Sequence, residues 1–166
     1  MEYLIDSNSL FDAHNKWYRP KVFKSVWEFM AQNDCIKMST LVYNEIQYPD
    51  SLVNWTQKKF KNEQITPNTE IIDVYNDVME WVTNSTRWDD AGFSQWQLPD
   101  KADPWLVATA KVNHQIIVTF DGNGRAALPD LNSYSKREPK INSVAEHFNV
   151  KTITMYELLD QLQLSL

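Results

Sequence analysis

The chain has 166 residues, of which 43% are hydrophobic, and its 16 Lys and Arg against 22 Asp and Glu give a formal net charge of −6. This length predicts one domain, residues 1–166, with its own hydrophobic core. The acidic balance disfavours a general polyanion binder, because phosphate contacts depend mainly on Lys and Arg. Three glycines, one cysteine and three scattered histidines exclude a phosphate-cradling loop, a disulfide framework and a His-x-x-x-His metal pair.

The N-terminal segment carries no basic region followed by a long apolar stretch, and no run approaches 18 apolar residues. The sequence therefore predicts neither a signal peptide nor a membrane-spanning helix. With a single thiol in addition, we expect the protein in the cytoplasm.

Short apolar or β-branched runs predict strands, and apolar residues at helical spacing predict helices. In the first part of the chain we expect a strand at 3–5, helices at 8–18 and 21–33, a strand at 36–38, and a helix that is capped by Ser39 or Thr40 and runs to Ile46. A helix at 52–61 capped by Ser51, a weak strand at 64–66 and helices at 68–84 and 93–96 follow. The last part should contain a helix capped by Asp103, a strand at 115–120, a helix at 140–148, a strand at 151–153 and a helix at 155–164. This alternation predicts an α/β fold whose parallel sheet is covered on both faces.

Four acidic residues lie where such a fold builds sites. Asp6 and Asp121 each follow a predicted strand, Asp103 stands at a helix start, and Glu45 lies in a helix that begins just after a strand. In open parallel sheets, ligands bind beyond the carboxyl ends of the strands. Carboxylates gathered there repel one another unless cations lie between them, and Mg²⁺ or Mn²⁺ suits oxygen ligands. The matching chemistry is metal-assisted hydrolysis of phosphodiester bonds.

Each of these acids also has a plainer interpretation. Asp103 before Pro104 is a good helix cap, Glu45 suits a solvated helix face, and Asp121 suits the turn at Gly122. Asp6 is the hardest to explain in this way, because an acid at the end of a buried strand needs a partner, a capping role or a metal.

Two segments carry a resemblance to a known family. Leu4–Asn8 and Ala102–Ala110, the latter followed by Ile117–Asp121, resemble the signature of PIN-domain nucleases. The tail from Pro139 to Leu159 resembles a PIN-like bacterial family of mostly uncharacterised proteins related to the VapC-type toxins. The resemblance covers nearly the whole chain.

The resemblance implies a three-layer α/β/α sandwich with about five parallel strands, and a Mg²⁺- or Mn²⁺-dependent endoribonuclease of the toxin kind. It implies an RNA substrate and adds a protein antitoxin and a second copy of the chain as candidate partners, with no membrane. The family's four acidic positions are matched by Asp6, Glu45, Asp103 and Asp121, and its supporting polar positions by Asn8 and Thr119. Glu28 and Glu63 also precede Asp103 and compete with Glu45 for its position.

Two stretches are longer than in compact PIN toxins: the one from Glu45 to Asp103, with the Trp-rich 81–96 segment as the excess, and the 122–139 loop. Three basic clusters are candidates for contact with a phosphate backbone: Arg19/Lys21/Lys24, Lys58/Lys59/Lys61 and Lys136/Arg137/Lys140. The third lies downstream of Asp121, so we expect it to contact RNA.

Two other functions compete with the nuclease. One is a PIN-like protein-interaction module without catalysis. The other is a phosphatase with an aspartyl nucleophile after its first strand, but that chemistry requires Asp-x-Asp, whereas this chain reads Asp6-Ser7-Asn8.

Overall fold

The computed structural model describes residues 1–121 and 137–165. Its centre is a five-stranded parallel sheet in the order β3-β2-β1-β4-β5. The strands are β1 (Tyr3–Ile5), β2 (Ile36–Ser39), β3 (Gln64–Ile65), β4 (Ile116–Val118) and β5 (Thr152–Ile153). This architecture confirms the predicted α/β class and its five parallel strands.

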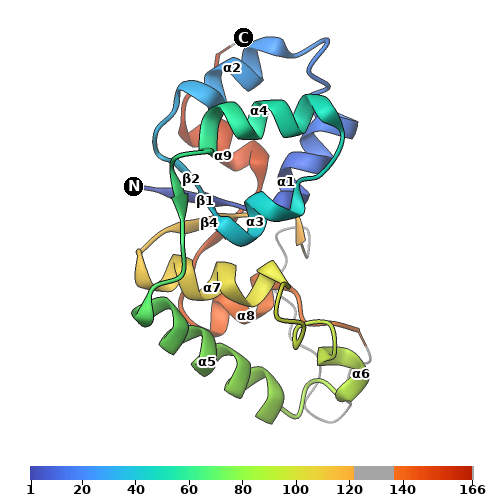
Figure 1. Ribbon diagram of the computed structural model, residues 1–166, viewed down its shortest axis with the longest axis vertical. Helices are drawn as coiled ribbons and strands as arrows, with labels where there is room; N and C mark the ends of the chain where they lie inside the picture. Colours follow the sequence, from blue (N-terminus) through green and yellow to red (C-terminus); the bar gives the residue numbers. More distant parts are fainter. Residues whose placement is uncertain (122–136, 166) are drawn as a thin grey trace.

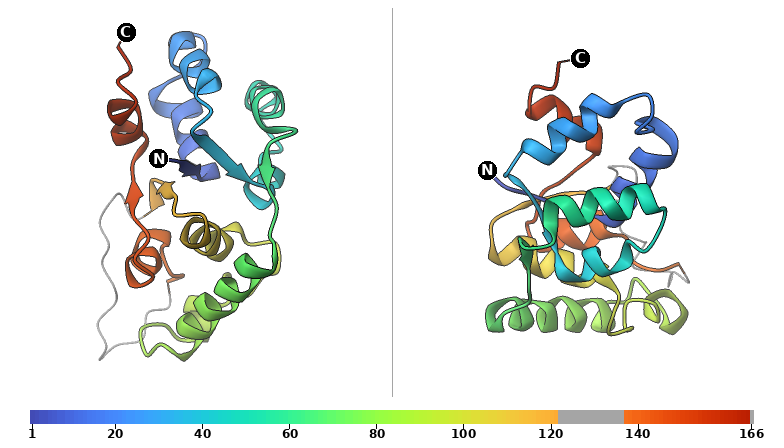
Figure 2. Two further views of the ribbon diagram at one scale, coloured as in Figure 1. Left: turned by 90° about the vertical axis from the view of Figure 1, so that its left-hand side faces the viewer. Right: turned by 45° about the horizontal axis from the view of Figure 1, so that its top comes forward.

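Helices cover both faces of the sheet. They are α1 (Ser7–Asp12), which continues into the π-helical segment η1 (Ala13–Trp17), α2 (Lys24–Gln32), α3 (Thr40–Glu45), α4 (Asp50–Phe60), α5 (Thr69–Asn84), α6 (Asp90–Phe93), α7 (Ala102–Val112), α8 (Ile141–His147) and α9 (Met155–Gln161). Figures 1 and 2 show α1, α2, α4 and α9 on one side of the sheet and α7 and α8 on the other, with α5 outside α7. Within the described residues, no helix is long and apolar enough to cross a membrane.

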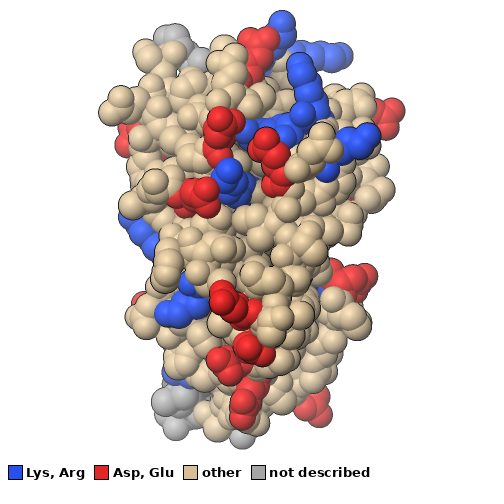
Figure 3. All heavy atoms as spheres, turned by 60° about the vertical axis from the view of Figure 1, so that its left-hand side comes forward, with Lys and Arg blue, Asp and Glu red and all other residues tan. Residues whose placement is uncertain are grey.

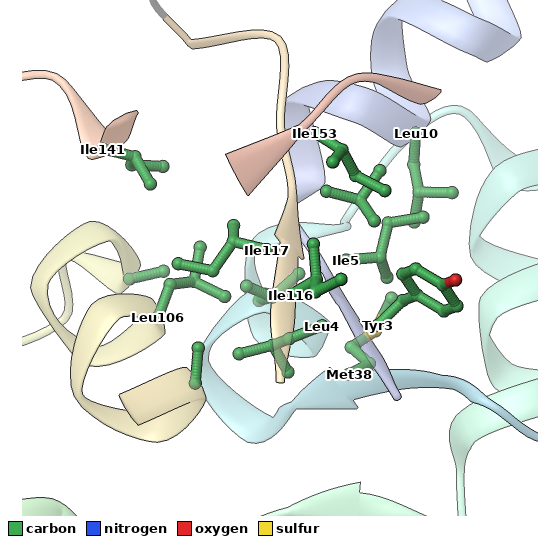
Figure 4. Close-up of a cluster of buried hydrophobic side chains, with 14 of the residues drawn as sticks. Tyr3, Leu4, Ile5, Leu10, Met38, Leu106, Ile116, Ile117, Ile141 and Ile153 are labelled. Atoms are coloured by element: carbon green, nitrogen blue, oxygen red, sulfur yellow. The ribbon is translucent and has the colours of Figure 1, made fainter. Parts of the chain in front are cut away.

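The core forms on both faces of the two central strands. Leu4 of β1 and Ile117 of β4 are register partners, both are fully buried, and they lie on the side of Leu106 of α7 (Figure 4). Ile5 lies on the other side, near Leu10 of α1. Burial on both faces explains why these strands are continuous apolar runs and do not alternate between apolar and polar residues.

Several boundaries differ from the sequence prediction, and three of these differences have a clear local cause. Helix α7 begins at Ala102, so Asp103 lies inside its first turn and is not its cap, because the Asp103 carboxylate faces a lysine and not the free backbone N–H groups. Helix α4 begins at Asp50, and the Ser51 hydroxyl bonds to His14 Nε2 at 2.7 Å and does not cap the helix. The short helix expected at 93–96 is α6 at 90–93, because the Asp89 side chain accepts a bond from Gly92 N and starts it earlier.

The Trp-rich segment at 81–96 packs into the core. Trp88 and Trp96 are 3% and 0% exposed, and the ring of Trp81 stacks on His147 with centroids 3.9 Å apart. The excess length that the sequence shows here therefore adds buried structure around α5 and α8.

We predict that Trp96→Ala lowers the free energy of unfolding by about 3–5 kcal/mol, because it leaves a large cavity in a close-packed region. Gln97→Ala is the matched control: its side chain is exposed, and it should change stability by no more than about 0.5 kcal/mol. Urea denaturation of both variants measures the difference. Equal, small effects would mean that the 81–96 segment is dispensable for the core.

Candidate active site

The order in which strands are added to the sheet reverses between β1 and β4. From β1 the chain builds outward through β2 and β3, and then returns to place β4 and β5 on the other side of β1. The carboxyl ends of β1 and β4 therefore flank the switch point at which parallel sheets form their binding crevice. Asp6 follows β1 and Thr119 follows β4, and the Thr119 hydroxyl donates to Asp6 Oδ2 at 2.8 Å.

Asp6 is buried at this point, with 1% of its surface exposed. It precedes α1, but its side chain makes no capping hydrogen bond, so the capping explanation does not hold. The pKa of its carboxyl is raised to about 7, first by burial and then by the charges of Asp103, Glu45 and Asp121, while the hydrogen bond from Thr119 lowers it. A carboxylate of this kind is costly to keep ionised without a cation nearby.

Glu45 is the glutamate that the fold brings to Asp6. It ends α3, the helix that follows β2, and its Oε2 accepts a bond of 2.6 Å from the Ser7 hydroxyl. Glu28 instead forms an exposed pair with Lys24 on α2. Ser7 was missed by the sequence analysis, although its position directly after Asp6 was a usable signal.

Asp103 is buried in the first turn of α7 and faces a lysine. Lys101 Nζ lies 3.1 Å from Asp103 Oδ2 and 3.3 Å from Glu138 Oε2. Burial raises the pKa of Asp103 to about 6, although Lys101 opposes this rise, and Asp121 and Glu138 add to it. Burial alone would lower the pKa of Lys101, but Asp103 and Glu138 raise it above its usual value.

Asp121 has a partner on each carboxylate oxygen. Lys140 Nζ lies 3.0 Å from its Oδ1, and the backbone N–H of Ile141 donates to its Oδ2 at 2.8 Å. Its own N–H donates to Thr119 Oγ1 at 3.0 Å, which joins it to Asp6 through one hydroxyl. Lys140 also lies 3.8 Å from Glu138, so Glu138 connects the lysines beside Asp103 and Asp121.

Lys101 and Glu138 are further residues that the sequence analysis missed. Lys101 stands two residues before Asp103 and Glu138 two before Lys140, so their proximity in sequence to residues already singled out was the available signal. The pairing of Glu138 with Lys101 depends on the contact between the start of α7 and the segment that precedes α8.

The donor chemistry at this edge suits a divalent cation, because all four acids offer carboxylate oxygens and their charges act on one buried group. Their present placement is less favourable. Within residues 1–121 and 137–165, no three acidic, His or Cys side chains stand close enough together to hold one ion. The ligand atoms are therefore of the type that a divalent cation prefers, but the carboxylates of Asp103 and Asp121 are paired with lysines.

Of the remaining predicted site residues, Lys140 contacts this group. Asn8 is exposed on the first turn of α1. Lys136 falls outside the described residues, Arg137 is exposed, and Lys140 faces Asp121.

Residues of the other two basic clusters meet at one pocket. Lys24, Lys58 and Lys59 line a hollow of about 340 Å³ with Trp27 and Trp55. Lys59 is committed to structure there, because its ammonium donates to two carbonyl oxygens at the end of α2. On the face drawn in Figure 3, basic and acidic side chains mix in the upper part, and acids gather in the lower part, where α5 lies, with basic side chains at its left edge.

Comparisons with known proteins agree with this fold. Residues 3–166 match the family model described as "Domain of unknown function (DUF4411)", so the chain belongs to that family. Among solved structures, a chain in the crystal structure of VapBC2 from Rickettsia felis bound to a DNA fragment from their promoter superimposes with a TM-score of 0.50 at 15% identity, covering 93% of this chain and 98% of that one. No curated protein matches significantly. The likeness supports the PIN-like fold that the sequence predicts.

The raised pKa of Asp6 predicts a pH dependence of stability. Because the folded state holds this proton more tightly than the unfolded state, the metal-free protein should gain stability as pH falls from about 8 through 7 toward 4. Asp6→Asn should remove the part of this gain that Asp6 supplies, leaving the smaller part from Asp103, and should raise the melting temperature at pH 8, since an amide keeps the acceptor for Thr119 without the charge.

Thermal unfolding in EDTA across this pH range measures the difference between wild type and variant. At about 1.4 kcal/mol per pKa unit, the two curves should diverge by on the order of 2–4 kcal/mol. Asp160→Asn, an exposed change on α9, is the control and should leave the wild-type profile unaltered. A lower stability of Asp6→Asn at pH 8 would show that the charge has a stabilising partner.

Proposed function

We propose that this member of the DUF4411 family is a metal-dependent endoribonuclease of the PIN type, which hydrolyses RNA phosphodiester bonds with Mg²⁺ or Mn²⁺. The observation that carries the proposal is Asp6, a carboxylate buried at the switch point of a PIN-like sheet and acted on by the charges of three further acids. A buried group of this kind favours a bound cation, and the same edge is where parallel sheets bind ligands.

The residues proposed to hold the cation are Asp6, Glu45, Asp103 and Asp121. When bound there, a divalent cation activates water and stabilises the charge that develops on the phosphate. Thr119 fixes the orientation of Asp6 through its hydrogen bond, and Ser7 does the same for Glu45. The two hydroxyls thereby keep a carboxylate oxygen of each acid directed within the site.

The proposed partners follow from the likeness of the fold to the VapBC2 structure. The VapBC2 structure is a complex bound to promoter DNA. We therefore propose a protein antitoxin as the partner that controls the ribonuclease. Lys140 and Arg137 are the proposed RNA contacts on the described part of the loop that leads to α8.

A second candidate is the protein-interaction module without catalysis. The pairing of Asp103 with Lys101 and of Asp121 with Lys140 favours it, because internal ammonium groups already neutralise two of the four acids. The two functions differ in whether cleavage of RNA occurs and requires metal.

We predict that the protein cleaves RNA with Mn²⁺ or Mg²⁺, that EDTA stops cleavage, and that Asp6→Asn or Asp103→Asn lowers the rate by on the order of 100-fold or more, because an amide lacks the charge that holds the metal. Cleavage of a fluorescent single-stranded RNA measures the rates. Asp77→Asn, an exposed change on α5, is the control and should retain full activity. A folded, metal-supplied protein that cleaves no RNA favours the interaction module.

The hydrogen bond from Thr119 gives a subtler test. Thr119→Val should weaken Mn²⁺ binding by about 10–100-fold, because it removes the donor that orients Asp6, whereas Thr119→Ser keeps the hydroxyl and should restore binding. Titration calorimetry with Mn²⁺ separates the two variants. Equal affinities in Val and Ser variants would mean that Asp6 needs no orientation by this residue.

A further inference from the structure

The proposed site contains cations of its own. Five carboxylates gather at this edge when Glu138 is included with the four predicted acids, and two lysines lie among them. Lys101 is the more enclosed of the two, since 24% of its side chain is exposed against 46% for Lys140. Among the described residues, some of the carboxylates are therefore paired with a lysine and others are not, and this difference decides where an added ion can bind.

Two of the acids, Asp121 and Asp103, already have charged or N–H partners, and we call these the outer acids. Both oxygens of Asp121 have partners, Lys140 and the N–H of Ile141. Oδ2 of Asp103 faces Lys101, whose ammonium is held from the other side by Glu138. A second ion would have to displace an enclosed ammonium group that two carboxylates hold.

The other two acids, Asp6 and Glu45, which we call the inner acids, have only hydroxyl partners among the described residues and are available to a cation. Oδ2 of Asp6 accepts from the neutral hydroxyl of Thr119, and Oε2 of Glu45 accepts from that of Ser7. Neither hydroxyl neutralises a charge, so the attraction for a cation remains strongest beside Asp6. Two-metal hydrolases place their ions about 3.5–4 Å apart. Here the Asp103 oxygen that a second ion would need already faces the Lys101 ammonium.

We propose that the Lys101 ammonium takes the place of a second metal ion, so that the site binds one divalent cation, beside Asp6. The inference rests on the proposed metal-dependent function. In this arrangement Lys101 is a positioning residue, which holds Asp103 and supplies the second positive charge that a phosphodiester meets. Glu138 fixes Lys101 in that position.

The test is the number of Mn²⁺ ions bound per chain, measured by equilibrium dialysis and titration calorimetry with the metal alone. Wild type should bind one ion. Lys101→Gln should bind two, because the amide removes the competing charge and frees Asp103 Oδ2, whereas Lys101→Arg should still bind one. Lys111→Gln, an exposed lysine on the same helix, is the matched control and should bind one.

Two ions in wild type would overturn the inference and leave the proposed function standing, as would a single ion in a folded Lys101→Gln protein, checked by circular dichroism. If Lys101→Gln does not fold, the counts for wild type and Lys101→Arg decide, because two ions in either contradict the inference. A wild-type protein that binds no Mn²⁺ would remove the proposed function itself and this inference with it.

Discussion

The buried carboxylate of Asp6 is the constraint on which the rest of this site depends. A strand that passes through the centre of the sheet must be apolar on both faces, and β1 meets this requirement up to the residue at which it ends. Placing an acid at that residue leaves a charge where water does not reach it. The hydroxyl of Thr119 offsets part of the cost, and the neighbouring acids add to it.

The lysines give the same edge a structural role. Lys101 and Lys140 meet at Glu138, so the first turn of α7 and the segment before α8 are tied through one carboxylate. Asp121 extends this connection, because it binds Lys140 and also the N–H that opens α8. The acids therefore both hold the site together and supply its proposed chemistry, and each pairing that steadies the fold limits what the acid can bind.

Most of the fold could be predicted from local patterns. The apolar runs of β1 and β4 marked central strands. Of the two caps expected for α3, Ser39 and Thr40, Ser39 is the cap, and its hydroxyl accepts from Val42 N. The local pattern gave a wrong prediction where a neighbouring charge competed for the same side chain. Asp103 has the sequence of a helix cap, but its carboxylate pairs with Lys101, and the helix begins at Ala102, two residues before the start that such a cap predicts.

The sequence by itself determined the parallel α/β architecture and the acids at its strand ends, because hydrophobic periodicity and strand-end positions are local properties. Only the tertiary structure decided which glutamate reaches Asp6, since Glu28, Glu45 and Glu63 are alike in sequence, and the turn from β2 into α3 selects Glu45. It also decided that Glu138 joins Lys101 to Lys140. Charges distant in the chain interact only once packing sets their distance and removes the water between them.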